Sequence, residues 1–457
     1  MVLTDTKNLA SPHLLARLLA RVRKWRAGEH ALTQRMAGTA FMIRVASAAI
    51  IFLSQVLLAR WMGDTEFGIY VYAWTWLMLV GELVHLGMPL TAQRFIPEYS
   101  HAGAFGLLRG YLAGSRWITF GAGTVAALLG ALIVHAVEDR LDSHVIMPFY
   151  LVCAALPFYA STFMFDAMAR SYNWINVALL PPYILRPLLL VAGVAVARAA
   201  GFAMDATTVT AALALASWLS ALLQLAMLQR RLGTVVPPGA KDYDARLWFN
   251  TALPIVLVWG MYTLLTATDV IVLKIFQPAG EVAHYYAAAK TLALVSIIQY
   301  AVAAASAHRF TAYHVAGDRA GLVAFAAGTV RWVFWPSLAG CTLMLLLGKP
   351  VLTLFGAGFS DGYPVIVILA IGQLARACVG PAERLLNVLG QQRTCALAYA
   401  AAFAVNLLGC FVLAPRFGGI CVAYATASAF IVESALLFLI ARRRLGLHMF
   451  IWRRQSA

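Results

Sequence analysis

Residues 38–63 read GTAFMIRVASAAIIFLSQVLLARWMG, an apolar run long enough for one helix to cross a lipid bilayer. Arg44 lies inside this run, and the polar residues Ser47, Ser54 and Gln55 follow it. A cation in the hydrocarbon core costs about 2.5 kcal/mol or more unless its environment compensates the charge. The run therefore predicts a membrane-spanning helix in which Arg44 has a specific structural or functional task.

The composition of the whole chain indicates an all-α integral membrane protein. Of its 457 residues, 62% are apolar and 12% are charged, whereas soluble domains carry about 25% charged residues. The net charge of +16 fits basic loops at one membrane face, so nucleic acid is not an expected partner. The six cysteines fall in apolar runs without CxxC spacing, which favours packing residues over disulfides or metal ligands.

Proline, glycine and charged clusters divide the chain into twelve predicted spans of about 20 residues each. Lysine and arginine concentrate at both termini and in the loops that follow the even-numbered spans. By the positive-inside rule, we expect both termini to be cytoplasmic and the acidic loop VEDRLD (137–142) to face the other side. The predicted spans are 38–60, 67–90, 110–134, 145–169, 177–198, 207–229, 248–273, 282–305, 322–347, 364–388, 395–414 and 419–441.

The second half of the chain repeats features of the first. SQVLLARWMGDTEFGIYVYAWT begins at Ser54, and TDVIVLKIFQPAGEVAHYYAAAKT begins at Thr268, 214 positions later. The sequence RRLG also occurs twice, at 230–233 and at 443–446. Two matches at nearly one offset predict two homologous six-helix bundles in parallel orientation. With one small gap, the aligned pairs include Arg60 with Lys274, Tyr70 with Tyr285, and Thr75 with Lys290.

These features predict five segments along the chain. Paired bundles around a central cavity are typical of alternating-access transporters. The sequence contains neither GxxxxGK[ST] nor HExxH, so we expect no cofactor, no metal and no enzymatic activity. The segments are a basic amphipathic N-terminal segment (1–37), the first bundle (38–230), a cytoplasmic linker (231–246), the second bundle (247–441) and a basic tail (442–457).

Several motifs, in this order, resemble those of the polysaccharide-biosynthesis flippases. They are LLARWMGDTEFGIYVYAWTWLMLVGELVHLGMPLTAQRFIPEY (57–99), TDVIVLKIF (268–276), LFGAGFSDGYPVIVILAIGQL (354–374), LLNVLGQQR (385–393) and VNLLGCFVLAPRFGGICVAYATASA (405–429). The resemblance implies the multidrug/oligosaccharidyl-lipid/polysaccharide (MOP) exporter superfamily, with a V-shaped, two-bundle fold like that of the MATE transporters.

The resemblance also implies a function, a location and partners. The expected substrate is an undecaprenyl-diphosphate-linked oligosaccharide, flipped across the bacterial inner membrane for O-antigen, exopolysaccharide or capsule synthesis. Twelve spans, without the two extra C-terminal spans of the peptidoglycan-precursor flippases, favour this branch. Membrane lipids, a polysaccharide polymerase and glycosyltransferases are the further expected partners. The alternative is a proton- or sodium-coupled multidrug exporter of the same superfamily.

A diphosphate inside a membrane needs cations and polar groups, and arginine suits phosphate through its planar fork of donors. Alternatives stay open for each cation: Arg44 and Lys290 could extend toward the lipid headgroups, Arg186 could anchor a helix end, and Arg376 could pair with Glu383, seven positions on. The candidate substrate-binding residues are Arg44, Ser47, Gln55, Arg186, Lys290 and Arg376.

Few acidic residues fall inside the predicted spans, and these are candidates for ion coupling. Glu82 and His85 are three positions apart in GELVHLG, so they share one helix face. Asp269 shares a face with Tyr262 and Thr266 in the seventh predicted span. A hydrogen bond between helices is the structural alternative for Glu82, and a contact near the outer end of the span is the alternative for Asp269.

Overall fold

The computed structural model describes residues 29–452, apart from the side chains of 29–37, 39–41, 254, 257, 258, 304, 307, 308, 416 and 417. Within the described residues, every regular element is a helix, and twelve helices are long and apolar enough to cross a membrane. The predicted all-α class and the twelve spans are therefore confirmed. Most of the predicted N-terminal segment (1–37) lies outside the described residues, because α2 begins at Glu29.

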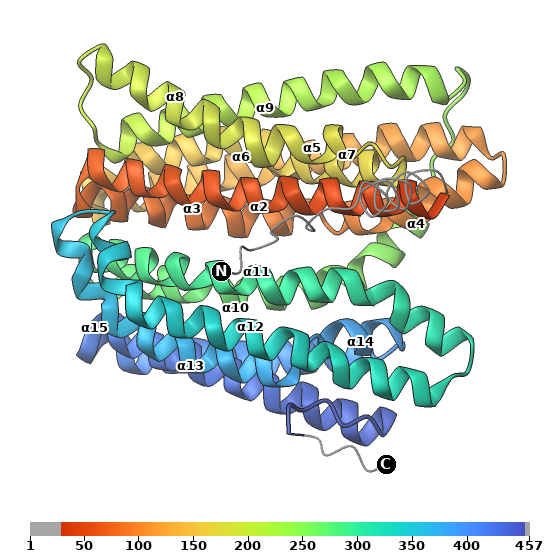
Figure 1. Ribbon diagram of the computed structural model, residues 1–457. Helices are drawn as coiled ribbons and strands as arrows, with labels where there is room; N and C mark the ends of the chain where they lie inside the picture. The colour runs from red at the N-terminus through yellow and green to blue at the C-terminus, as the bar shows by residue number, and fades with distance from the viewer. Residues whose placement is uncertain (1–28, 453–457) are drawn as a thin grey trace, which may run out of the picture.

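The helices form two layers that correspond to the two halves of the chain (Figure 1). The first layer holds α2 (Glu29–Met62), α3 (Asp64–Val84), α4 (Met88–His101), α5 (Phe105–Val137), η1 (Glu138–Arg140), α6 (Ser143–Ser171), α7 (Ile175–Leu180), η2 (Pro181–Leu185), α8 (Arg186–Ala199) and α9 (Ala206–Val235). The second holds α10 (Ala245–Phe276), α11 (Ala279–Val315), α12 (Arg319–Thr353), η3 (Ala357–Gly362), α13 (Tyr363–Val379), α14 (Ala382–Val388) and α15 (Gln392–Leu445).

Glycine and proline interrupt individual predicted spans, and a further break separates the last two. Gly87 adopts a left-handed conformation (φ 73°) and Pro89 follows in the first turn of α4, so α3 and α4 are separate helices. Pro181 and Pro182 lack amide donors, and the chain forms a short π-helix there. Gly418 (φ 65°) kinks α15, which therefore supplies the last two spans.

The two layers are in contact at both ends of the molecule, and at one end Trp248 and Ala252 of α10 are buried in a core with α4, α5 and α6. We call the end that carries the 236–244 loop between α9 and α10 the linker side; it lies at the right of Figure 1. At the opposite side, Gly68 of α3 lies so close to Ala279 of α11 that a Cβ would overlap the Ala279 carbonyl oxygen. Phe67 packs there on Tyr286, with ring centroids 6.2 Å apart. One hydrophobic core therefore joins the two halves at the opposite side.

The end of the chain is more ordered than the predicted basic tail (442–457) suggests. Helix α15 continues to Leu445, and Gly446 ends it in a left-handed conformation. The alternate residues Leu447, Met449 and Ile451 are buried against α11, α12 and α14. Residues 446–452 thus belong to the core of the second half.

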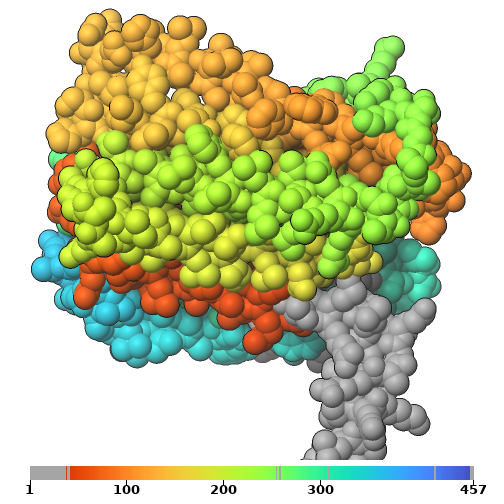
Figure 2. Space-filling view, turned by 90° about the horizontal axis from the view of Figure 1, so that it is seen from above, coloured from red at the N-terminus to blue at the C-terminus, as the bar shows by residue number. Residues whose placement is uncertain are grey.

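Helix α2 lies along the boundary between the halves, between α8 and the segments of the second half (Figures 1 and 2). Its residues Met42 and Leu53 are 67% and 61% exposed, as expected for side chains that face lipid. Ser47, Ser54 and Gln55 are buried, so the polar face of α2 points into the protein. The position of α2 brings Arg44 to the boundary between the two halves.

Candidate functional site

A cavity of about 410 Å³ lies at the boundary between the two halves. Helix α3 supplies only four of its lining residues, and the second half supplies the others from α10, α11, α13 and α15. The α3 residues are Thr75, Met78, Leu79 and Glu82, which follow the i, i+3, i+4, i+7 pattern of one helix face. The cavity therefore belongs mainly to the second half.

Glu82 connects the two halves across this cavity. The Trp259 indole nitrogen of α10 donates a hydrogen bond to Glu82 Oε2 at 2.9 Å. His85 Nε2 lies 3.7 Å from the same oxygen, as the three-residue spacing predicts, but His85 is buried and does not line the cavity. The inter-helix hydrogen bond considered for Glu82 is present, and it leaves the carboxylate at the cavity wall.

Lys290 and Asp269 both line the second-half wall. The Lys290 ammonium lies 5.0 Å from the ring centroid of Tyr286, one turn earlier on α11. Asp269 Oδ2 accepts a hydrogen bond from the Tyr285 hydroxyl at 2.8 Å. Tyr285 faces α10 and Tyr286 faces the cavity, so neighbouring positions of α11 contact the acid and the cation.

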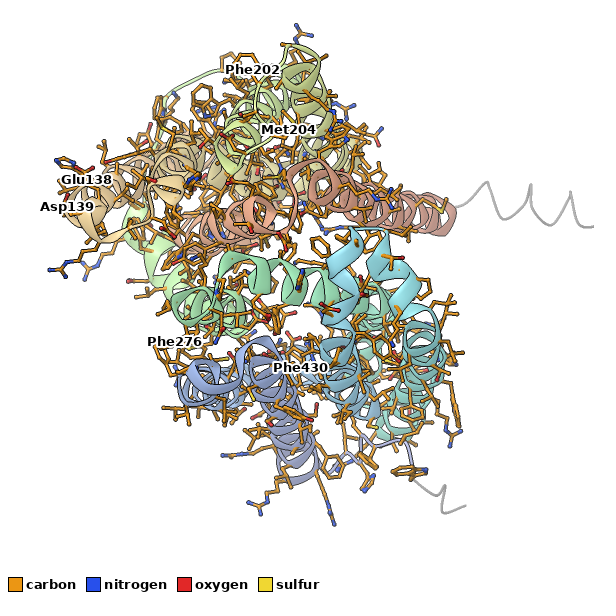
Figure 3. The ribbon with its side chains drawn as sticks, turned by 90° about the vertical axis from the view of Figure 1, so that its left-hand side faces the viewer. Glu138, Asp139, Phe202, Met204, Phe276 and Phe430 are labelled. Atoms are coloured by element: carbon orange, nitrogen blue, oxygen red, sulfur yellow. The ribbon has the colours of Figure 1, made fainter. Side chains whose placement is uncertain are left out.

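Arg376 lines the cavity but pairs with a different acid from the one expected. Its Nε lies 3.4 Å from Glu433 Oε1 on α15, and Glu433 is almost fully buried. Glu383 instead accepts a hydrogen bond from Asn387 in α14. The proposed Arg376–Glu383 pair is wrong because the helix ends at Val379 and the chain turns at Gly380 before Glu383. Phe430, labelled in Figure 3, lies under the Arg376 guanidinium at 4.8 Å.

Arg44 lies outside the cavity lining, between aromatic rings of both halves. Its guanidinium carbon is 4.3 Å from the ring centroid of Tyr183 in η2 and 5.6 Å from that of Tyr300 in α11. Tyr300 is 52% exposed, so this place opens toward lipid. The structure thus separates Arg44 from Lys290, which we had expected to share one cavity.

Arg186 is also outside the cavity lining. It follows Tyr183 by three residues and begins α8 directly after the π-helix η2. Its guanidinium carbon is 4.7 Å from the Tyr159 ring centroid and 5.8 Å from that of Trp74. Trp74 precedes the cavity residue Thr75, so Arg186 is close behind the α3 wall.

Ser47 and Gln55 are internal to the first half. The Ser47 hydroxyl donates to the Arg44 carbonyl at 2.8 Å, within its own helix. Gln55 contacts the Tyr70 hydroxyl through its side chain. Neither residue lines the cavity, so the structure gives them packing contacts and no access to a ligand there.

The embedded cations fall into two groups by their partners. Arg376 and Arg170 have carboxylates, and the Arg170–Asp166 pair is bidentate at 2.7 and 2.9 Å. Arg44, Arg186 and Lys290 have aromatic rings, and no carboxylate oxygen among the described side chains lies within 4 Å of them. Rings compensate a cation less completely than a carboxylate does. These three cations therefore have capacity for an anionic ligand.

Sequence reasoning missed several cavity residues. Trp259, Gln373 and Phe430 line the cavity, yet Trp and Phe in an apolar span look like ordinary packing residues. Gln373 carried a usable signal, because it is an amide in an apolar span three residues before Arg376. Among the described side chains, no group of three His, Cys, Asp or Glu residues could hold a metal ion.

Solved structures share this fold. An inward-facing multidrug resistance MATE family transporter of the MOP superfamily superposes with a TM-score of 0.71 at 13% identity, covering 89% of this chain and 94% of that one. The lipid II flippase MurJ, in an inward closed conformation, gives 0.71 at 13% identity over 88% and 87%. A MOP transporter from Pyrococcus furiosus gives 0.67 at 12% identity over 90% and 95%.

The sequence comparisons identify the family. No curated protein sequence matches this chain. The family model described as polysaccharide biosynthesis protein matches residues 36–308, which include the whole first half and the cavity residues of α10 and α11. With its twelve apolar helices and the fold of the MOP transporters, this membrane protein belongs to the polysaccharide biosynthesis protein family.

Proposed function

We propose that this protein is a flippase for undecaprenyl-diphosphate-linked oligosaccharides of O-antigen, exopolysaccharide or capsule synthesis. The observation that carries the proposal is the set of embedded cations Arg44, Arg186 and Lys290, which have aromatic neighbours and no carboxylate within ion-pair distance among the described residues. A diphosphate supplies negative charge for cations of this kind, and sugar hydroxyls are a second type of partner for the Lys290 ammonium inside the cavity. Membership of the polysaccharide biosynthesis family and the fold shared with a lipid II flippase support this substrate class.

The proposed mechanism is alternating access between the two halves. The lipid-linked head enters from the linker side, while the prenyl tail stays in lipid beside α2 and α11. Movement of the halves breaks the contacts of Gly68 and Phe67 at the opposite side and opens the cavity there. Glu82, with His85 beside it, and Asp269 are the proposed ion-coupling groups, because both carboxylates reach the cavity wall.

We place the linker side at the cytoplasm of a bacterial inner membrane, with both termini there. The acidic residues Glu138 and Asp139 lie at the opposite side and at the periphery of the molecule (Figure 3), as the charge rule expects. Glycosyltransferases then supply the substrate on the linker side and a polymerase consumes it on the other. A C-terminal fusion tests the orientation: green fluorescent protein should fluoresce, and alkaline phosphatase should be inactive.

The decisive experiment is complementation in the native host. Arg44→Ala and Lys290→Ala should each reduce surface polysaccharide at least tenfold, at membrane protein levels equal to wild type. Arg331→Gln removes an exposed arginine of α12 and should keep wild-type polysaccharide. Wild-type amounts of surface polysaccharide in both Arg44→Ala and Lys290→Ala would contradict the assignment of these residues to substrate binding.

The second candidate function is proton- or sodium-coupled multidrug export. It rests on Glu82 and Asp269 at the wall of a partly aromatic cavity, a lining suited to organic cations. Deleting the gene discriminates the two functions. Loss of surface polysaccharide without altered drug susceptibility supports the flippase, and the reverse result supports drug export.

A further inference from the structure

The molecule contains two different polar environments that a lipid-linked glycan could use. The cavity has four lining residues with formal charge: Glu82, Asp269, Lys290 and Arg376. Two are acids and two are cations, so the lining has no net charge. At the boundary outside the cavity, Arg44 and Arg186 contact aromatic rings, and Asp166, the acid that interacts electrostatically with Arg44, is itself paired with Arg170. Positive charge in excess therefore lies outside the cavity.

The balanced lining suits an uncharged sugar better than a diphosphate. A diphosphate that joins a lipid to a sugar carries two negative charges, and Glu82 and Asp269 would repel it at short range. Sugar hydroxyls both donate and accept hydrogen bonds, so they can use carboxylate, amide and ammonium groups together. The cavity offers all three: the carboxylates, Gln373 and Lys290.

Aromatic side chains on the second-half wall provide apolar surfaces beside these polar groups. Trp259 and Tyr262 lie with ring centroids 5.8 Å apart, and both line the cavity with Phe430. The C–H faces of a pyranose ring pack on such rings through dispersion. Trp259 is 40% exposed, so its ring remains available while its indole nitrogen bonds to Glu82.

The boundary site is close enough to the cavity for one substrate to occupy both. Ser296 lines the cavity, and Tyr300, which faces Arg44, is four residues further along α11. Four residues correspond to one helical turn on one face, a rise of about 6 Å. A diphosphate beside Arg44 thus lies about one turn from the cavity, on the lipid-exposed side where Tyr300 is 52% exposed.

We propose that the substrate divides between two subsites: the cavity binds an uncharged sugar on Trp259 and Tyr262, and the diphosphate stays at the boundary between Arg44 and Tyr300. This inference rests on the proposed flippase function and assigns the two parts of its substrate. Lys290 then serves the sugar hydroxyls, and Arg44 serves the phosphate. The transported glycan has a neutral first sugar, because a carboxylate there would meet Glu82 and Asp269.

The test measures binding of two partial ligands to the full chain in nanodiscs. Farnesyl diphosphate is the probe for the boundary site, with farnesol as its uncharged control. Methyl β-D-glucopyranoside is the probe for the cavity, observed by saturation-transfer NMR and compared with D-glucuronate. The variants are Arg44→Gln, Trp259→Leu and Lys290→Met, with Arg331→Gln as the matched loss of an exposed arginine.

We expect Arg44→Gln to weaken farnesyl diphosphate binding at least tenfold and to leave the glucoside signal unchanged. Trp259→Leu should abolish the glucoside signal, and Lys290→Met should change farnesyl diphosphate affinity by less than twofold. A loss in Lys290→Met equal to that in Arg44→Gln, or a stronger signal from glucuronate than from the glucoside, would overturn the division. Farnesyl diphosphate binding no tighter than farnesol would overturn the flippase function itself.

Discussion

In the first half, Gln55 contacts the buried Tyr70, whereas the equivalent positions of the second half hold Asp269 and Tyr285. The two pairs are separated by 214 and 215 positions, the offsets of the sequence repeat. Both tyrosines are almost fully buried. The same tyrosine thus contacts an amide in one half and an acid in the other, which confines this candidate coupling group to the second half.

The aligned residues Thr75 and Lys290 make the same comparison at the cavity. Both line it, Thr75 on α3 and Lys290 on α11. The Thr75 hydroxyl is used within its own helix, where it donates to the Val71 carbonyl at 2.8 Å. Lys290 has no such internal partner among the described residues, so the second half provides the charged wall.

Each half contains an arginine paired with an acid, Arg170 with Asp166 in the first and Arg376 with Glu433 in the second, and other cations that lie beside aromatic rings. Arg376 in the second half has a buried acid, Glu433, whereas Arg44 and Arg186 in the first half have aromatic rings. A buried ion pair is internally complete, but a cation over a ring can still bind an anion. The comparison indicates that Arg376 stabilises the second half and that Arg44 and Arg186 are available to a ligand.

The largest effect is expected from breaking the internal pair of the second half. Arg376→Gln leaves the Glu433 carboxylate buried without its cation and should destabilise the protein by about 3 kcal/mol or more. Thermal unfolding in detergent, followed by size-exclusion chromatography, measures the loss of stability. The double variant Arg376→Gln/Glu433→Gln should recover most of the stability. Equal losses in the single and double variants would show that the pair is not the cause.

The next effect concerns Gly68 and its aligned counterpart in the second half, Ala283. Gly68→Ala places a Cβ on the Ala279 carbonyl oxygen and forces the halves apart. It should lower the free energy of unfolding by about 2 kcal/mol. Ala283→Gly adds no atoms at the contact; it should lower the free energy of unfolding by about 1 kcal/mol through helix propensity and by about 1 kcal/mol more through loss of a buried methyl group. Labelling of a cysteine introduced at Thr65 reports opening at this side. Unchanged labelling in Gly68→Ala would contradict its role in closing the halves.

A third experiment separates the acid of the second half from the amide of the first. In Asp269→Asn the amide oxygen keeps the hydrogen bond from the Val270 backbone N–H and the side-chain NH2 donates to the Tyr285 hydroxyl, so the free energy of unfolding should change by about 1 kcal/mol or less. Flipping in proteoliposomes should then no longer respond to a proton or sodium gradient. Gln55→Leu should retain that response. A full gradient response in Asp269→Asn would remove it from the coupling site.

The smallest effect is expected at the boundary between the halves. Tyr300→Leu removes the more distant of the two rings beside Arg44. It should lower the free energy of unfolding by only about 0.5 kcal/mol, because the Tyr183 ring remains 4.3 Å from the guanidinium. We expect a two- to threefold loss of farnesyl diphosphate affinity. Tyr183→Leu should cost more. A larger loss in Tyr300→Leu than in Tyr183→Leu would mean that Arg44 is held mainly by the second half.

The sequence by itself determined the class, the twelve spans and the internal repeat. Span length follows from bilayer thickness and apolar content, both of which are local properties of the chain. The repeat aligned Thr75 with Lys290, and both line the cavity. Short-range spacing also accounts for the Asp166–Arg170 pair, because residues four apart on a helix are neighbours.

Only the tertiary structure decided which embedded charges meet. Arg376 pairs with Glu433, 57 positions away, rather than with the nearby Glu383, because α13 ends and α15 packs against its inner face. Arg44 and Lys290 are both cations inside predicted spans and therefore both candidates to bind a diphosphate. Tyr183 and Tyr300, however, hold Arg44 at the lipid boundary. Helix rotation and long-range packing set these distances, and periodicity within one span contains no information about its neighbours.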